Sequence, residues 1–257
     1  MINSLHSTIL GEGNALIILH GFLGMSDNWK TLGIKYAELG LQIHLVDQRN
    51  HGRSFHSDDF DYDILATDLA QYIDEHKLKN PTIIGHSMGG KTAMQFAMSY
   101  PNLLHKLIVA DIAPKYYPPH HHSIIEGLNQ LNFSEIKSRG EADRVLAQYI
   151  NEQGIRQFLL KNLYWIEKGK LALRFNLPIL SQKMEEIGDN INATDLYKGP
   201  TLFLRGDRSE YITTQDKEGI KRHFPIASIE TIENAGHWLH AENPKQFFDK
   251  SMAFINL

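Results

Sequence analysis

Cysteine is absent from the 257 residues of this chain. The chain therefore has no disulfide, no thiolate ligand for a metal and no cysteine nucleophile, which fits a reducing compartment such as the cytoplasm. Long apolar segments are missing as well, because no run reaches the roughly 18 consecutive apolar residues typical of a membrane-spanning helix. We therefore expect no membrane span.

Blocks of basic residues are also missing, and the net charge at pH 7 is −4. Without a cluster of lysine and arginine side chains to contact phosphates, no nucleic-acid partner is expected. The first residues, MINSLHSTILGEGN, have no basic flank and no long apolar run, so we expect neither a signal peptide nor an anchor. A hydrophobic content of 42% and a charged content of 22% are ordinary for a globular enzyme, and we expect a cytoplasmic one.

Short apolar runs alternate with helix-length amphipathic segments along most of the chain. The strand-like runs are residues 15–22, 42–48, 81–87, 106–112, 201–206 and 227–233. Continuous apolar runs of this length are typical of strands that are covered on both faces, as in a parallel sheet. Helix-length segments such as 62–76 and 89–100 lie between them. The alternation predicts an α/β fold with a doubly wound, mostly parallel sheet.

This alternation breaks between residues 114 and 194, where apolar residues recur at helical spacing. Prolines stand where the segment begins, and Gly199-Pro200 lies near its end. Roughly 80 residues are too many for one ordinary crossover connection. We therefore expect an α/β core of residues 1–113 and 195–257, with a helical lid of residues 114–194 inserted over the C-terminal edge of the sheet.

The sequence GHSMG at residues 85–89 matches the pattern G-x-S-x-G. It follows a predicted strand and precedes a predicted helix, which is the setting of a nucleophile elbow, a sharp turn that exposes a serine hydroxyl above a sheet. The helix that follows directs its N-terminal N–H groups toward developing negative charge. This setting predicts Ser87 as a catalytic nucleophile.

A serine nucleophile needs a base, and the chain has fourteen histidines. His237 follows the last predicted strand and precedes the C-terminal helix, in the chain order serine then histidine that this fold uses, so we predict it as the base. We expect His86 to point away from the serine into the turn, and His240 to pack or cap. The run at 120–122 is interpreted as a solvated loop and not as a metal site, because adjacent residues cannot all face one ion.

Backbone N–H groups that bind an oxyanion are predicted from two places. The sequence HGFLG at residues 20–24 follows an early strand, and a loop in this position supplies one N–H while the residue after the serine supplies the other. We therefore assign the oxyanion hole to the backbone N–H groups of Phe22 and Met88.

Together, HGFLG at 20–24, GHSMGG at 85–90 and NAGHW at 234–238 resemble the α/β-hydrolase superfamily over nearly the whole chain. Two further stretches, DQRNHGRS at 47–54 and GGKTAM at 89–94, are similar to a branch of small esterases and thioesterases. That branch includes abhydrolase-domain-containing protein eleven and its bacterial relatives. The resemblance implies an α/β-hydrolase fold. We expect Asp47 and Arg49 to pair and to tie their loop to the edge of the sheet, a structural role.

The acid that orients the histidine is harder to place. Many members of the superfamily carry it three residues after the glycine that ends the strand TLFLRG, and here that position is Ser209, which carries no charge. Asp207 lies two residues too early and Glu210 one too late, and both stay open as alternatives.

A second candidate ends the earlier strand run KLIVADI. Asp111 stands at the tip of the strand expected beside the elbow strand, and the esterase branch that this chain resembles carries Asp at the matching position. The chain order of serine, acid and histidine is kept. The alternative is that Asp111 caps the loop after its strand, a common use of Asp. We favour Asp111.

These residues predict a serine carboxylesterase or acyl-thioesterase that needs neither cofactor nor metal. Its partner is a small-molecule acyl ester or thioester, and oligomeric state is left open. The side chains expected at the substrate are Leu23, Phe158, Leu163, Trp165 and Trp238, with the lid residues forming an apolar acyl pocket. Alternatives with the same three groups are a cofactor-free haloperoxidase, a lyase, or a receptor that retains them to bind a small ligand.

Overall fold

A seven-stranded sheet forms the centre of the computed structural model, which describes residues 4–191 and 195–257. The strand order is β1-β3-β2-β4-β5-β8-β9; β1 pairs antiparallel with β3 and every other pairing is parallel. Each predicted strand run overlaps one of these strands, while β1 was not predicted. The strands are β1 (Ser7–Leu10), β2 (Asn14–Leu19), β3 (Leu41–Val46), β4 (Thr82–His86), β5 (Lys106–Ala110), β8 (Thr201–Gly206) and β9 (Ser228–Ile232). The prediction of a doubly wound, mostly parallel sheet is confirmed.

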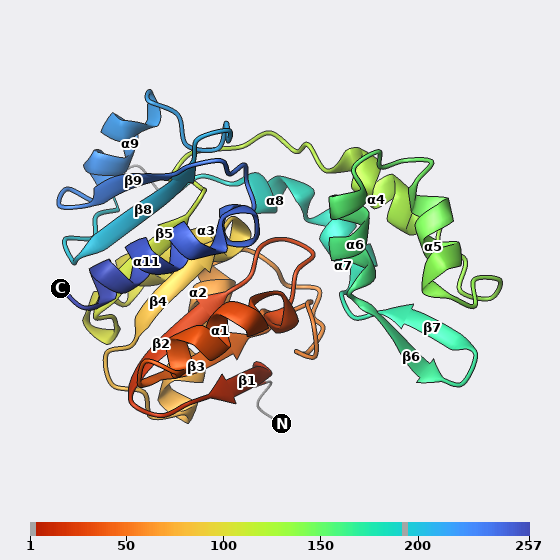
Figure 1. Ribbon diagram of the computed structural model, residues 1–257, viewed down its shortest axis with the longest axis horizontal. Helices are drawn as coiled ribbons and strands as arrows, with labels where there is room; N and C mark the ends of the chain where they lie inside the picture. Colours follow the sequence, from red (N-terminus) through yellow and green to blue (C-terminus); the bar gives the residue numbers. More distant parts are fainter. Residues whose placement is uncertain (1–3, 192–194) are drawn as a thin grey trace.

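Helices cover both faces of this sheet (Figure 1). Successive strand residues point to opposite faces. Ile17 belongs to an apolar cluster that includes residues of α2 (Tyr62–Glu75), α3 (Met88–Ser99) and α9 (Asp216–His223). Leu16 belongs to a different cluster, which includes residues of α1 (Lys30–Ala37) and α11 (Pro244–Ile255). Burial on both faces explains why the strands are continuously apolar. Short helical turns complete this part: η1 (Ser26–Trp29), η2 (Pro101–Leu103) and α10 (Leu239–Glu242).

The segment between β5 and β8 lies to one side of the sheet (Figure 1). It contains α4 (His122–Asn129), α5 (Arg139–Leu146), α6 (Gln153–Leu160), α7 (Leu177–Gln182) and α8 (Met184–Gly188). It also contains an antiparallel hairpin of β6 (Leu163–Glu167) and β7 (Lys170–Leu173), so the expectation of helices alone was wrong. Gly169, with a φ of 85°, provides the turn between these strands. The division into a core and a lid stays a prediction, and "lid" is used below for residues 114–194.

Among the described residues, no helix combines the length and the apolar composition that crossing a membrane requires.

The strand order alone indicates where a ligand-binding site is expected in this sheet. From β2 the chain proceeds to β3 on one side and then to β4 on the other, so the direction of winding reverses between β2 and β4. In open α/β sheets, ligands bind in the crevice beyond the carboxyl ends of the strands at such a point. The loop at residues 20–24 follows β2 and Ser87 follows β4.

Candidate active site

Ser87 occupies a strained turn between β4 and α3. Its φ of 53° and ψ of −120° are sparsely populated for a residue with a side chain. A Cβ at Gly85 would lie 2.2 Å from the carbonyl oxygen of Gly89, and one at Gly89 would lie 2.5 Å from that of His20. Only glycine fits at either position, so the two glycines of the motif allow the tight turn.

The three predicted catalytic side chains form one hydrogen-bonded line. Asp111 directly follows β5, and His237 lies between β9 and α10. The His237 Nε2 atom lies 3.0 Å from the Ser87 Oγ, and its Nδ1 atom lies 2.9 Å from the Asp111 Oδ2. The Tyr211 ring stacks on the imidazole with 3.7 Å between ring centroids. With the proton on Nδ1 and directed at the carboxylate, Nε2 is free to accept the serine proton.

The Asp111 carboxylate is fully buried and accepts further hydrogen bonds. The Gly206 N–H donates to Oδ1 at 3.1 Å, and the Ser209 hydroxyl donates to Oδ2. Burial raises the pKa of Asp111 to about 6, and the Ser209 and Gly206 hydrogen bonds act in the opposite direction. Burial lowers the pKa of His237 below its usual value. At pH 7 the carboxylate is therefore ionised and the imidazole neutral, as a general base requires.

The alternative acids have other surroundings. Asp207 accepts the backbone N–H groups of Asn234 and Ala235, each at 2.9 Å, and so anchors the loop that precedes His237. The Glu210 side chain is exposed. Ser209, where the sequence lacks the usual acid, donates its hydroxyl hydrogen bond to the Asp111 carboxylate. The chain position of Ser209 indicated this contact, because an acid at that position would have to reach the same histidine.

In the predicted oxyanion loop, both backbone polar groups of Leu23 form hydrogen bonds. The Leu23 N–H donates to the His51 Nε2 at 3.2 Å, and its carbonyl accepts from the Asn162 Nδ2 in the lid at 2.9 Å. The His51 Nδ1 lies 2.9 Å from the Arg49 carbonyl, which assigns the proton to Nδ1. Burial lowers the pKa of His51 to about 3, so the ring stays neutral and Nε2 stays an acceptor. The sequence did not identify His51 or Asn162 as contacts of this loop.

The amide groups of the predicted oxyanion hole border the nucleophile. Phe22 and Met88 line the same cavity as Ser87. Within residues 4–191 and 195–257, neither of the two N–H groups donates to another atom of the chain. Both are therefore available to a ligand.

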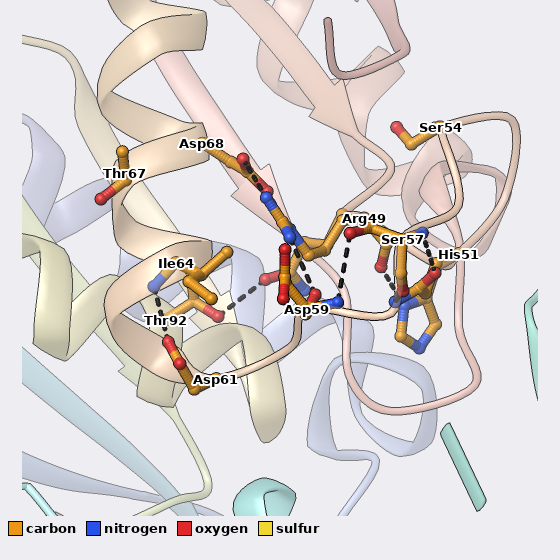
Figure 2. A network of polar contacts seen from close by, with 12 residues as sticks. Arg49, His51, Ser54, Ser57, Asp59, Asp61, Ile64, Thr67, Asp68 and Thr92 are labelled. Carbon is orange, nitrogen blue, oxygen red and sulfur yellow. Dashed lines mark hydrogen bonds and ion pairs between the residues drawn. The ribbon is translucent and has the colours of Figure 1, made fainter. Parts of the chain in front are cut away.

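The loop after β3 is tied down by the network in Figure 2. The predicted pair of Asp47 and Arg49 is wrong. Arg49 forms a bidentate ion pair with Asp68 of α2, at 2.5 and 2.7 Å, and donates to the Asp59 carbonyl at 2.8 Å. Asp47 accepts the Ser26 N–H at 2.6 Å and a second backbone N–H. These contacts anchor the loop to α2 and η1 and not to the edge of the sheet, and its structural role stays a prediction.

Two hollows meet at Ser87. A large pocket of about 800 Å³ is lined by residues of the core and of the lid, and a small cavity of about 20 Å³ adjoins it at Ser87, Phe22, His120, His121 and Tyr211, which line both. Of the predicted substrate contacts, Leu23, Phe158 and Trp238 line the large pocket. Leu163 does not, because it is buried in the core of the lid. Trp165 does not either, because it lies on the hairpin with 53% of its surface exposed.

The histidine run at 120–122 contributes more than a solvated loop. His120 and His121 line both hollows, the His120 Nε2 pairs with the Tyr211 hydroxyl, and the His121 ring contacts that of Phe22 with 5.1 Å between centroids. Burial lowers the pKa of His121 to about 3. In the described part of the chain, no group of three or more His, Asp or Glu side chains is arranged to hold a metal ion.

Two further histidines, His86 and His240, line the large pocket. The His86 Nε2 lies 2.8 Å from the His237 carbonyl oxygen, so the His86 side chain points toward the loop that carries His237. The His240 ring stacks on Trp29 with 4.0 Å between centroids, in agreement with the predicted packing role.

Comparisons with known proteins agree with the observed fold. Residues 14–134 match the family model described as "alpha/beta hydrolase fold". The sn-1-specific diacylglycerol lipase ABHD11 of Mus musculus is 37% identical over 94% of this chain and 80% of its own length. Esterase YbfF of Escherichia coli K12 is 34% identical over 95% of this chain and 94% of its own length. The solved structure of a marine microorganism esterase, 43% identical, superposes with a TM-score of 0.95 over 98% of this chain and 99% of that one.

Proposed function

Because the chain belongs to the α/β-hydrolase fold family, in its esterase branch, we propose that it is a serine carboxylesterase or acyl-thioesterase acting through an acyl-enzyme on Ser87. Hydrolysis of an ester bond is the activity that these relatives share by name, and it is the activity of this chain. The observation that carries the serine mechanism is the hydrogen-bonded line from Ser87 through His237 to Asp111. The substrate is a small acyl ester or thioester.

The first half of the reaction forms the acyl-enzyme. His237 Nε2 takes the proton of Ser87 as its oxygen attacks the carbonyl carbon, and the N–H groups of Phe22 and Met88 bind the oxyanion. The buried Asp111 carboxylate stabilises the imidazolium that forms. When the tetrahedral intermediate collapses, the bond to the leaving group breaks and the imidazolium protonates the departing oxygen or sulfur.

The second half releases the acid. A water molecule gives its proton to His237 Nε2 and attacks the acyl carbon, again with the oxyanion at the two N–H groups. Collapse of this intermediate breaks the bond to Ser87, whose oxygen recovers the proton from His237. The enzyme returns to its starting state without a cofactor.

Labelling and hydrolysis test the proposal together. A fluorophosphonate should label Ser87 stoichiometrically, and Ser87→Ala should leave only background hydrolysis of p-nitrophenyl acetate and butyrate. The matched control is Ser134→Ala, an exposed serine of the lid that should keep wild-type rates. Short acyl-coenzyme A thioesters, followed by the released thiol, test the thioesterase arm. Labelling at another residue, or an active Ser87→Ala variant, contradicts the mechanism. Labelling at Ser87 without turnover of any ester or thioester favours a lyase or a receptor.

A further inference from the structure

The aromatic ring that covers the imidazole of His237 lies outside the hydrogen-bonded line of Ser87, His237 and Asp111. Tyr211 lies in the loop after β8, and its ring stacks on the His237 ring with 3.7 Å between centroids and 15° between the planes. Because carbon atoms in contact stay about 3.5 Å or more apart, this centroid distance leaves little lateral offset between the rings. The phenol therefore presents its face, and not its edge, to the imidazole.

A face-to-face contact has different consequences for the two protonation states of His237. The face of an aromatic ring is electron-rich, so two neutral rings avoid a direct sandwich and prefer offset or edge-to-face packing. A cation over the same face is attracted to it. Burial lowers the pKa of His237, so the imidazole is neutral in the resting site and gains a positive charge only when it accepts a proton during the reaction. The contact with Tyr211 is therefore stronger for the charged ring than for the resting one.

Both halves of the proposed reaction pass through this charged state. His237 Nε2 accepts a proton from Ser87 in the first half and from water in the second. An interaction that is stronger with the charged ring lowers both barriers, whereas one of equal strength in both states would not accelerate the chemical step. The ring of Tyr211 is thus placed to affect the rate, which ordinary packing would not do.

The main chain of Tyr211 is held by the same network as the acid. Its N–H donates to the Ser209 Oγ at 3.2 Å, and its carbonyl accepts the Tyr117 hydroxyl at 2.5 Å. Ser209 in turn donates to the Asp111 carboxylate. One short segment therefore supports both the carboxylate at one edge of the imidazole and the ring that covers one of its faces.

The hydroxyl group of Tyr211 connects its ring to the lid. It forms a hydrogen bond with the His120 Nε2, and the His120 Nδ1 lies 3.0 Å from the Pro118 carbonyl oxygen. A carbonyl can only accept, so in the neutral ring of His120 the proton is on Nδ1 and the Tyr211 hydroxyl donates to Nε2. Burial raises the pKa of Tyr211 to about 12, so this hydroxyl keeps its proton. A phenol that donates in this way is polarised, which increases the electron density of its ring.

We infer that Tyr211 is a positioning residue that stabilises the protonated form of His237 through the face of its ring, with its hydroxyl group held by His120 of the lid. This inference rests on the proposed function, because the imidazolium forms only if His237 acts as the base for Ser87. It gives the loop after β8 a role in the reaction that does not depend on an acid in that loop.

A fluorination series at position 211 tests the inference, because fluorine withdraws electron density from the ring face and hardly changes the size of the ring. Phenylalanine is the reference, and mono-, di- and trifluorinated phenylalanine follow. Each added fluorine should lower kcat and kcat/KM for p-nitrophenyl acetate equally, by about fivefold to thirtyfold over the series, with KM unchanged. The same series at Tyr116, a lid tyrosine with 48% of its surface exposed, is the matched control and should leave both constants within about twofold.

Two ordinary substitutions separate the ring from its hydroxyl group. Tyr211→Phe keeps the ring face and loses only the hydrogen bond to His120, so kcat should stay within about threefold of wild type. Tyr211→Leu removes the face and should lower kcat about fivefold to thirtyfold. Circular dichroism and fluorophosphonate titration count the folded, reactive sites of each variant.

The outcomes separate this inference from the proposed function. If Ser87 is labelled and the fluorinated variants are as fast as the phenylalanine variant, the inference is wrong and the serine mechanism stands. The inference is also wrong if Tyr211→Phe is as impaired as Tyr211→Leu, because the hydroxyl group and not the ring face then carries the effect. A series that raises KM at constant kcat would place the ring against the substrate and overturn the inference as well. If Ser87 is not labelled at all, the proposed function fails and the inference fails with it.

Discussion

Replacing Asp111 by asparagine tests the part of the site that the sequence left most open. The carboxylate has two distinct oxygens: Oδ2 faces the His237 Nδ1 at 2.9 Å and the Ser209 hydroxyl, and Oδ1 accepts the Gly206 N–H at 3.1 Å. An amide can keep only one oxygen. The substitution therefore leads to one of two arrangements, and each impairs the base.

In the first arrangement the amide NH2 takes the place of Oδ2. It donates to His237 Nδ1, so the imidazole proton moves to Nε2, which then cannot accept the proton of Ser87. In the second, the NH2 faces the Gly206 N–H, and two buried donors oppose each other at a cost of about 1–3 kcal/mol. The imidazolium in that case lacks the negative charge that stabilises it. The corresponding change in a serine protease lowers kcat about 10⁴-fold, and we expect a loss of at least about 100-fold here.

The assay is kcat on p-nitrophenyl acetate, with circular dichroism to check the fold. Glu210→Gln is the matched control, because it makes the same chemical change on an exposed side chain and should stay within about threefold of wild type. Asp207→Asn should also stay within about threefold, although it loses one of two hydrogen bonds to the His237 loop. If either control variant is severely impaired and Asp111→Asn is nearly normal, the acid lies after β8 and the reasoning is refuted.

The ionisation of Asp111 and the exposure of the hairpin lead to three further predictions. Because burial raises the pKa of Asp111 to about 6, kcat/KM should fall as the pH decreases through about 6 and the carboxylate takes up a proton. Ser209→Ala removes a hydrogen bond that lowers this pKa, so the midpoint should move to higher pH; a pH–rate profile with an unchanged midpoint would contradict the assignment. Trp165→Ala should leave the ratio of kcat/KM on p-nitrophenyl octanoate to kcat/KM on p-nitrophenyl acetate within about twofold of wild type, because its side chain is 53% exposed on the hairpin. A change in this ratio would mean that the hairpin reaches the substrate.

The parts of the fold that were predicted from the sequence have local causes. Strands buried on both faces must be continuously apolar, so β2, β4, β5 and β8 were recognised from composition alone. The elbow was recognised because its tight turn leaves room only for glycine at two positions. Asp111 could be favoured because the parallel sheet brings the ends of β4 and β5 to one edge.

The parts that were missed depend on contacts between distant segments. Among the residues that the structure describes, β6 and β7 pair only with each other and are partly exposed, so these strands lack the apolar pattern of the central sheet. Arg49 is near Asp47 in sequence, but the bidentate geometry of its guanidinium is satisfied by Asp68 on α2. The small cavity at Ser87 is lined by Met88 and Lys91 of α3 together with Met184, Ile187 and Gly188 of α8. No local sequence pattern predicts the volume of a cavity that forms between segments distant in the chain.

The two hydrogen bonds of Leu23 have a consequence for protein engineering. A chimera that carried the lid of another hydrolase without an amide at position 162 would leave the buried Leu23 carbonyl without its partner. The same loop carries the Phe22 amide, so a graft intended to alter selectivity would also disturb the loop that is predicted to bind the oxyanion. The lid therefore cannot be exchanged independently of the core. The asparagine at position 162 has to be transferred together with the loop that it supports.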